Sequence, residues 1–222
     1  MKKGLSYLNE NPEENLPKIV DWLERFAIKP HHKRYLETAR EIIDDKDNNW
    51  YLLMQRGLRE INPNTLEKFL TSFMINSAFI GNARAMKMRE KHQCNIPWAV
   101  LMDPTAACNL KCKGCWAAEY DKADSLSNEE LDKIIKQGKK LKIYMYIYSN
   151  GEPLMRKNDL IKLAEKHNDC AFLAFTNGTL IDDAFAENLA RVGNFALAIS
   201  VEGYEEETDL RRGKGTYQKA IK

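Results

Sequence analysis

The sequence lacks a long apolar run and lacks a marked excess of charge of either sign. Roughly 18 consecutive apolar residues are needed to cross a bilayer, and no segment approaches that length. No apolar stretch of the signal-peptide type follows the first four residues. Lysine and arginine number 34 against 32 aspartate and glutamate residues, so no basic nucleic-acid-binding face is indicated. We therefore expect a cytoplasmic protein without a membrane span, and no nucleic-acid partner is indicated.

Cysteine is scarce, and its distribution argues against a disulfide framework. The count is five, an odd number, and three of the five fall within eight residues. This pattern favours free thiols in a reducing compartment. Cys94 and Cys170 stand apart from the other three, and we expect them to act as small, buried apolar side chains.

The clustered cysteines, Cys108, Cys112 and Cys115, have the spacing C-x3-C-x2-C. Three thiolates on one loop are able to hold a metal centre, but a closed zinc or iron-sulfur site normally needs a fourth ligand. Unless that ligand comes from elsewhere in the chain, the centre keeps one open coordination position. A substrate or cofactor would bind there.

The first part of the chain, residues 1–95, has a helical pattern throughout. Apolar residues at helical spacing predict a first helix that starts near residue 11 and ends at Pro30. Further helices are predicted over 33–44, over 49–60 and from residue 64 into the eighties. With 44% hydrophobic residues in 222, the whole chain is able to form one large or two small domains.

Strands and helices alternate in residues 96–222. The predicted strands cover 98–102, 142–148, 171–175 and 194–201. The predicted helices start at a capping box of Ser127 and Glu130, cover 159–167 and 182–191, and begin again at a Thr216 cap. Such alternation indicates an α/β fold, with about four parallel strands in a sheet or barrel and helices outside.

A chemically distinctive loop follows each predicted strand. In order, the loops contain the cysteines, then 149–153 (SNGEP), then 176–178 (TNG), then Glu202 with the later pair Arg211 and Arg212. The carboxyl ends of parallel strands lie at one edge of the sheet, where such folds bind ligands. The four loops are therefore expected to form one site.

These motifs in this order resemble the radical S-adenosylmethionine (radical SAM) superfamily, over roughly residues 96–222. The resemblance implies a partial, TIM-like (βα) barrel that is incomplete at its C-terminal end. It also implies that the cysteines bind three irons of a [4Fe-4S] cluster and that S-adenosylmethionine chelates the fourth. Reductive cleavage of S-adenosylmethionine then gives a 5′-deoxyadenosyl radical, which abstracts hydrogen from a substrate.

The resemblance also implies roles for single residues. Asn150, Gly151 and Glu152 match the family's Gly-Gly-Glu turn, whose backbone and carboxylate hold the methionine amino group. Asparagine replaces the first glycine, and it tolerates positive φ better than other side chains. The remaining expected cofactor contacts are Asn177, Ser200, Glu202, Arg212 and Trp116, and Arg211 is equally available in place of Arg212. Trp116 directly follows Cys115 and is expected to supply a stacking surface for the adenine.

Two alternatives remain open at the level of sequence. One is a structural zinc-binding interaction module, in which Cys94 or a histidine supplies the fourth ligand. The other is a fragment that binds the cluster without turnover. A low-potential electron donor of the ferredoxin or flavodoxin type is the expected partner, and the substrate is not indicated.

Overall fold

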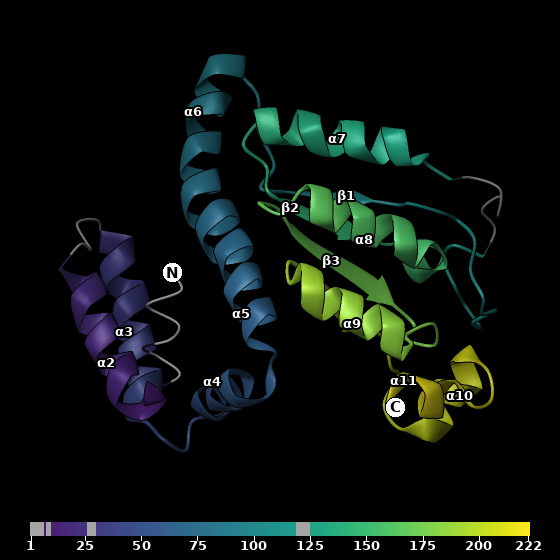
Figure 1. Cartoon of the computed structure of the whole chain (residues 1–222), viewed down its shortest axis with the longest axis horizontal. Coiled ribbons are helices and arrows are strands. Elements are labelled where there is room, and N and C mark those ends of the chain that lie inside the picture. Colours follow the sequence, from purple (N-terminus) through teal and green to yellow (C-terminus); the bar gives the residue numbers. More distant parts are fainter. Residues whose placement is uncertain (1–6, 8–9, 26–29, 119–124) are drawn as a thin grey trace. The chain divides into compact units, whose positions relative to one another are not determined.

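The computed structural model describes residues 7, 10–25, 30–118 and 125–222, and Figure 1 shows their course. The chain divides into two compact units at residues 67 and 68. The division into a helical domain at 1–95 and a core domain at 96–222 stays a prediction. Among the described residues, no helix is both long enough and apolar enough to span a membrane.

The first unit contains α2 (Pro12–Glu24), α3 (Pro30–Asp44) and α4 (Asn49–Glu60). The helix predicted at 49–60 is confirmed, and the Asn48 side chain caps it by accepting a hydrogen bond from the Trp50 amide. The expectation that Pro30 ends the first helix is wrong. Proline is well suited to the first turn of a helix because that position needs no amide donor, and Pro30 begins α3 instead.

The helix predicted from residue 64 into the eighties appears as three consecutive pieces. These are α5 (Pro63–Leu70), the π-helical segment η1 (Thr71–Gly81) and α6 (Asn82–His92). In the second unit, η1 lies beside the segment that precedes the third strand. Ser72 donates to the Asn168 carbonyl at 3.4 Å, and Asn76 donates to the Asp169 carbonyl at 2.9 Å. The amino end of β3 is thereby tied to η1.

The second unit is built on a parallel sheet of four strands in the order β1-β2-β3-β4. The strands are β1 (Ala99–Met102), β2 (Met145–Tyr148), β3 (Ala171–Thr176) and β4 (Phe195–Ile199). Each strand is paired in parallel with its neighbour in the sequence, and a helix-containing crossover connects the parallel strands. The predicted α/β fold with four parallel strands is confirmed.

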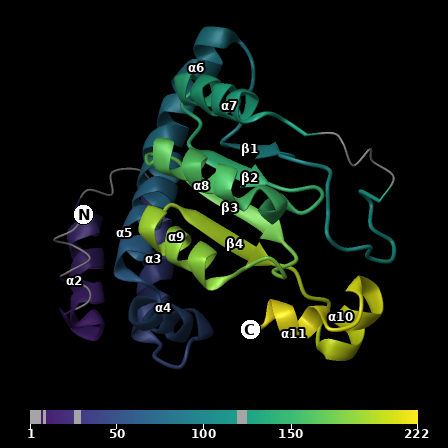
Figure 2. The same ribbon diagram turned by 45° about the vertical axis from the view of Figure 1, so that its right-hand side comes forward.

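Helices α7 (Asn128–Lys140), α8 (Lys157–Lys166) and α9 (Asp183–Val192) all lie on one face of this sheet (Figures 1 and 2). The predicted capping box starts α7, since the Ser127 hydroxyl accepts from the Glu130 amide and the Glu130 carboxylate accepts from the Ser127 amide. Aromatic rings fill the space beneath the helices: Tyr148 stacks on Phe172 with ring centres 5.8 Å apart. The opposite face is partly open, and Leu101 is 61% exposed there.

Two short helices follow β4, and the sequence pattern predicts only the second of them. The segment α10 (Glu205–Arg212) was not predicted because it has one buried residue, Thr208, and so no apolar periodicity. The next helix, α11 (Thr216–Ala220), starts at Thr216 itself, with Gly215 in the left-handed region before it. Thr216 is therefore the first residue of the helix rather than its cap.

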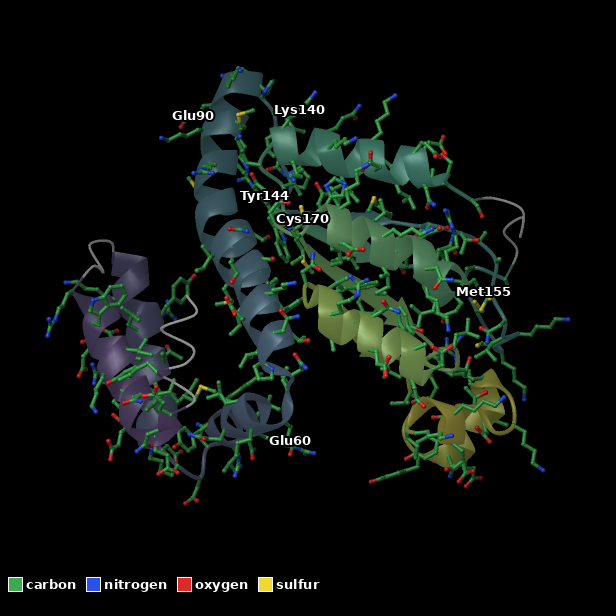
Figure 3. All side chains as sticks on the ribbon, viewed as in Figure 1. Glu60, Glu90, Lys140, Tyr144, Met155 and Cys170 are labelled. Carbon is green, nitrogen blue, oxygen red and sulfur yellow. The ribbon has the colours of Figure 1, made fainter. Side chains whose placement is uncertain are left out.

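Cys170 is fully buried in the core. Figure 3 shows it at the amino ends of the strands, far from Met155 at the carboxyl ends. Burial raises the pKa of this thiol, so it stays protonated at neutral pH. The prediction that Cys170 acts as a small apolar residue is confirmed, whereas Cys94 is exposed and that part of the prediction is wrong.

The contact between Gly138 of α7 and Tyr146 of β2 gives a test of this packing. A Cβ atom at residue 138 would overlap the Tyr146 hydroxyl, which donates to the Ile135 carbonyl at 3.0 Å. We expect Gly138→Ala to lower the free energy of unfolding by about 1–3 kcal/mol through overpacking. Urea denaturation followed by circular dichroism measures this, and the double variant with Tyr146→Phe should recover part of the loss. Full additivity of the two changes would contradict the proposed contact.

Candidate functional site

The three clustered cysteines lie on the long loop that connects β1 to α7, here called the cysteine loop (residues 103–127). Cys108, Cys112 and Cys115 are half-buried and line one cavity of about 460 Å³. Burial raises the pKa of the Cys108 thiol from its usual value, and the Leu110 amide, which bonds to its sulfur, partly offsets this. The thiols are thus held at one cavity and are partly shielded from water.

The three thiols share this cavity with no further ligating side chain from the described residues. In the part of the chain that the structure describes, no three histidine, cysteine, aspartate or glutamate side chains are gathered in a way that could hold a metal ion. Among the described residues, no other cysteine and no histidine lines the cavity. A set of three thiolates without a fourth ligand fits a [4Fe-4S] cluster that keeps one iron open.

The loop after β2 packs directly against the start of the cysteine loop. Asn150 has a φ of 71°, the left-handed value that its place in the turn requires. A Cβ atom on Gly151 would overlap the carbonyl group of Ala107. The Glu152 amide donates to that same carbonyl at 2.8 Å. Gly151 is therefore needed because the two backbones approach so closely.

The Glu152 carboxylate is turned into the protein. The residue is 1% exposed, and its Oε1 atom accepts from the Thr176 hydroxyl at 2.7 Å and from the Leu154 amide at 2.9 Å. Its Oε2 atom accepts from the Asn177 amide at 2.8 Å. These three internal donors hold the carboxylate in place, and its expected contact with a ligand's amino group stays a prediction.

Asn177 connects the end of β3 to the cysteine loop. Its Nδ2 donates to Asn109 Oδ1 at 2.9 Å, and its Oδ1 accepts from the amide of Thr179 at 2.9 Å. Asn109 in turn donates to the Thr179 hydroxyl at 2.8 Å. Asn109, which directly follows Cys108, was missed in the sequence because no spacing marks it. Asn177 supports the loop through these bonds, and its expected contact with the cofactor stays a prediction.

Glu202 and the two arginines after it form a charged cluster beside the cysteines. The Glu202 Oε1 atom accepts from Arg211 Nη1 at 2.6 Å and from Arg212 Nη2 at 2.6 Å. These bonds, with that of Arg211 the strongest, lower the pKa of Glu202. The backbone of Arg211 accepts from the Lys113 amide at 2.8 Å. The cluster thus touches the cysteine loop between Cys112 and Cys115.

The other two predicted site residues are more open. Ser200 is half-buried just after β4, and its amide donates to the Thr176 carbonyl at 2.9 Å. Trp116 is 64% exposed beside Cys115. The predicted site residues therefore all follow the carboxyl ends of the strands, either on the loops or, for Arg212, at the end of α10, as expected for a parallel sheet.

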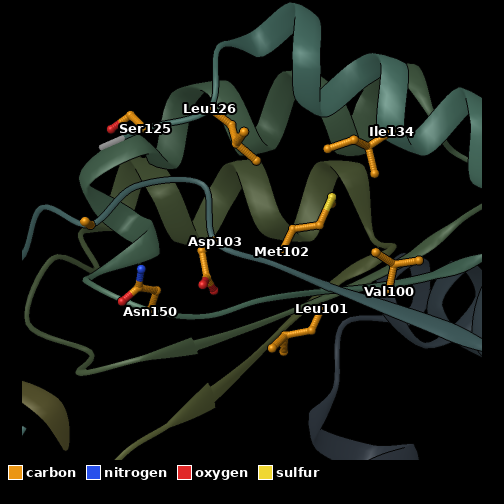
Figure 4. A pocket seen from close by; sticks show the side chains of 9 residues that line it. Val100, Leu101, Met102, Asp103, Ser125, Leu126, Ile134 and Asn150 are labelled. Carbon is orange, nitrogen blue, oxygen red and sulfur yellow. The ribbon is translucent and has the colours of Figure 1, made fainter. Parts of the chain in front are cut away.

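A second cavity of about 560 Å³ lies along β1 (Figure 4). Val100 and Met102 line it from one side of the strand and Leu101 and Asp103 from the other, while Ile134 of α7 forms part of its wall. Desolvation by neighbouring atoms raises the pKa of Asp103. Asn150 also lines this cavity, so it adjoins the loop after β2.

Comparison with known proteins gives one family. The sequence model of the Radical SAM superfamily matches residues 102–222. Fe-coproporphyrin III synthase of Methanosarcina barkeri is 37% identical over 128 residues, which are 55% of this chain and 32% of that protein. Pre-heme d1 synthase of Dinoroseobacter shibae is 33% identical over 127 residues, with 55% and 31% covered.

More distant similarities extend the range of relatives. PqqA peptide cyclase of Bradyrhizobium diazoefficiens is 30% identical over 115 residues, which are 50% of this chain and 30% of that protein. The crystal structure of Streptococcus suis SuiB bound to S-adenosylmethionine superposes with a TM-score of 0.52 and 20% identity, covering 82% of this chain and 42% of that chain. This last likeness concerns the fold alone. The chain spans about a third of the length of the curated relatives.

The internal role of Glu152 is testable by Glu152→Gln. The glutamine amide would place an NH2 group against the donors that surround the carboxylate in the parent. We therefore expect the free energy of unfolding to fall by about 2–3 kcal/mol. Urea denaturation measures this change. Glu187→Gln, on the exposed side of α9, is the control and should leave stability within about 0.5 kcal/mol of the parent. Equal stability of the two variants would contradict the internal role.

The close approach at Gly151 predicts a local effect of Gly151→Ala. The added methyl group has to displace the Ala107 backbone, so we expect the apo protein's Cys108 thiol to react at least several-fold faster with a thiol reagent. Mass spectrometry of the labelled peptides measures the rate. Gly57→Ala, in the interior of α4 where a Cβ meets only ordinary contacts, is the control. Unchanged labelling of Cys108 in Gly151→Ala would show that the approach is not restrictive.

Proposed function

Because this chain belongs to the radical SAM superfamily, we propose that it forms the cofactor-binding part of an enzyme that cleaves S-adenosylmethionine reductively. The observation that supports this most is the cavity lined by three thiols and by no other cysteine or histidine among the described residues. The chemistry that the two cofactors supply when bound is the formation of a 5′-deoxyadenosyl radical, which abstracts hydrogen from a substrate. The activity of the whole protein is part of this proposal.

The residues of the chain divide between binding and support in this proposal. Cys108, Cys112 and Cys115 hold three irons of a [4Fe-4S] cluster, and half-burial keeps water away from them. The backbone of Asn150 and Gly151 receives the methionine amino group of S-adenosylmethionine. Glu152 has a supporting role, because its buried carboxylate holds the turn in place through internal hydrogen bonds.

Arg212 is proposed as a partner for the cofactor carboxylate. Within the described part of the chain, Glu202 bonds to its Nε and Nη2 atoms, and the Nη1 edge points away from that pair. Ser200 and Trp116 are proposed to contact the ribose and the adenine, since both are accessible beside the cysteine loop. Asn177 has a supporting role through Asn109.

An acidic, low-potential electron donor of the ferredoxin or flavodoxin type is the proposed redox partner. Lys111 and Lys113 are exposed on either side of Cys112, and the Arg211 side chain is 43% exposed beside them. Positive charge at this rim favours encounter with an acidic partner. The relatives named above act on different substrates, and the proposal leaves the substrate of this chain open.

The zinc alternative has less support. Cys94 is exposed and does not line the cavity, and the His167 Nε2 atom lies 2.8 Å from Asp132 Oδ1, in an internal hydrogen bond. Neither is placed as a fourth ligand. The second alternative, a piece that binds the cluster without turnover, is separated from the main proposal by the experiment below.

The proposal predicts the result of Cys112→Ala in anaerobically reconstituted protein. The parent should bind iron and sulfide and, with dithionite and S-adenosylmethionine, form 5′-deoxyadenosine, whereas the variant should lose cluster absorbance and product together, because two thiolates hold the cluster poorly. Metal analysis, visible absorbance and chromatography measure these quantities. Cys94→Ala is the matched control and should behave like the parent.

The outcomes separate the alternatives. A parent that contains iron and sulfide but forms no product is a cluster-binding piece without turnover. A colourless parent with stoichiometric zinc would overturn the proposal in favour of a structural zinc module. Product formed equally by Cys112→Ala and the parent would also overturn it.

A further inference from the structure

Arg156 is not one of the predicted site residues, yet every N–H group of its guanidinium donates a hydrogen bond. It ends the short helix η2 (Pro153–Arg156), and its side chain is 17% exposed. Nη1 donates to the carbonyls of Pro104, at 3.0 Å, and Leu126. Nη2 donates to Asn128 Oδ1 at 2.7 Å and to Asp159 Oδ2 at 3.0 Å, and Nε donates to the same Asp159 atom at 3.1 Å. All five N–H groups are thus used.

The two carbonyl partners of Nη1 stand at opposite ends of the cysteine loop. Pro104 comes two residues after β1 ends, and Leu126 comes two residues before α7 begins. Just inside them, Thr105 and Ser125 form an isolated antiparallel bridge with their hydroxyl oxygens 2.9 Å apart. One nitrogen atom therefore holds both ends of the loop that carries the three cysteines.

We propose that Arg156 is a positioning residue that closes the base of the cysteine loop and so sets where the three thiols stand. It bonds to the backbone at the ends of the loop and not to a thiol. The loop has no helix or strand of its own over its described residues, so the places of its thiols depend on how its ends are held. The part of this proposal that concerns cluster assembly rests on the function proposed above, whereas loop closure itself does not.

No other side chain is equivalent at this position. A lysine offers three donors from one point, but the four acceptors of Arg156 come from three separate segments and need a planar fork. Without a donor, the Pro104 carbonyl is left buried and unpaired, which favours opening of the loop. Arg156→Lys should therefore be intermediate, and Arg156→Gln should have the larger effect.

The test of loop closure uses the apo form of the whole 222-residue chain and needs no cluster. Hydrogen exchange of peptides from residues 104–118 should be at least about tenfold faster in Arg156→Gln than in the parent, with a smaller increase in Arg156→Lys. In the variants, opening the loop no longer requires breaking the hydrogen bonds that Arg156 makes in the parent, so the loop opens more often. Peptides that cover β2 and β3 should exchange as in the parent. Arg191→Gln removes an exposed arginine paired with Glu165 and is the matched control, expected to match the parent in both regions.

A second variant separates the arginine from the neighbouring bridge. Ser125→Ala removes the hydroxyl contact with Thr105 and leaves Arg156 intact, so it should change exchange at 104–118 by less than about threefold. An effect of Ser125→Ala as large as that of Arg156→Gln, or unchanged exchange in Arg156→Gln, would overturn the proposal. If circular dichroism shows Arg156→Gln unfolded, the comparison of Arg156→Lys with Ser125→Ala decides the question by the same criteria.

Anaerobic reconstitution gives the readout that links closure to the cluster. Arg156→Gln should bind less than about half as much iron and sulfide as the parent and show correspondingly weaker cluster absorbance, with Arg156→Lys between them, since loose thiols capture the cluster poorly. Parent-like iron content in an Arg156→Gln protein with fast exchange at 104–118 would overturn the positioning role. A parent that binds no iron while the exchange differences persist would overturn the proposed function and leave loop closure standing.

Discussion

The buried carboxylate of Glu152 is the interaction on which the site depends. It accepts hydrogen bonds from the Thr176 hydroxyl, from the Asn177 amide and from the Leu154 amide, so one side chain joins the ends of β2 and β3. The residue is 1% exposed, and a carboxylate that is so deeply buried is stable only when hydrogen-bond donors surround it. Because its own amide donates to Ala107, the same residue fixes the cysteine loop against the sheet. The carboxylate and the backbone amide of this one residue together connect the three loops.

This constraint explains why the loop after β2 has its particular residues. Gly151 permits the close backbone approach, Asn150 adopts the left-handed φ of the turn, and Arg156 takes up the carbonyls at both ends of the cysteine loop. The residues of this short segment therefore act mainly on the protein itself. The resemblance assigns this turn to cofactor contact, and in the structure the Glu152 and Arg156 side chains bond to the protein itself.

The sequence was sufficient to predict the alternation of strands and helices, because β2 and β3 are apolar runs and α7 carries a capping box. It failed at α10, whose eight residues include one buried side chain, and at Pro30, which favours a helix start as readily as a helix end. The cysteines were evident from spacing alone. Asn109 and Arg156 were not, because their partners lie far away in the sequence and only the folded chain brings them together.

The charged residues around the cysteine loop differ in how their hydrogen-bonding groups are occupied. Arg156 uses all five of its N–H groups on fixed partners, and the buried Glu152 carboxylate accepts from three internal donors. Arg211 and Arg212 instead share one carboxylate oxygen of Glu202, so a second anion is able to compete for these arginines. Over its described residues the cysteine loop has no helix or strand, and the hydrogen bonds of Glu152 and Arg156 hold it in place. The binding proposed for Arg212 requires its pairing with Glu202 to be exchangeable, so the two requirements fall on different residues.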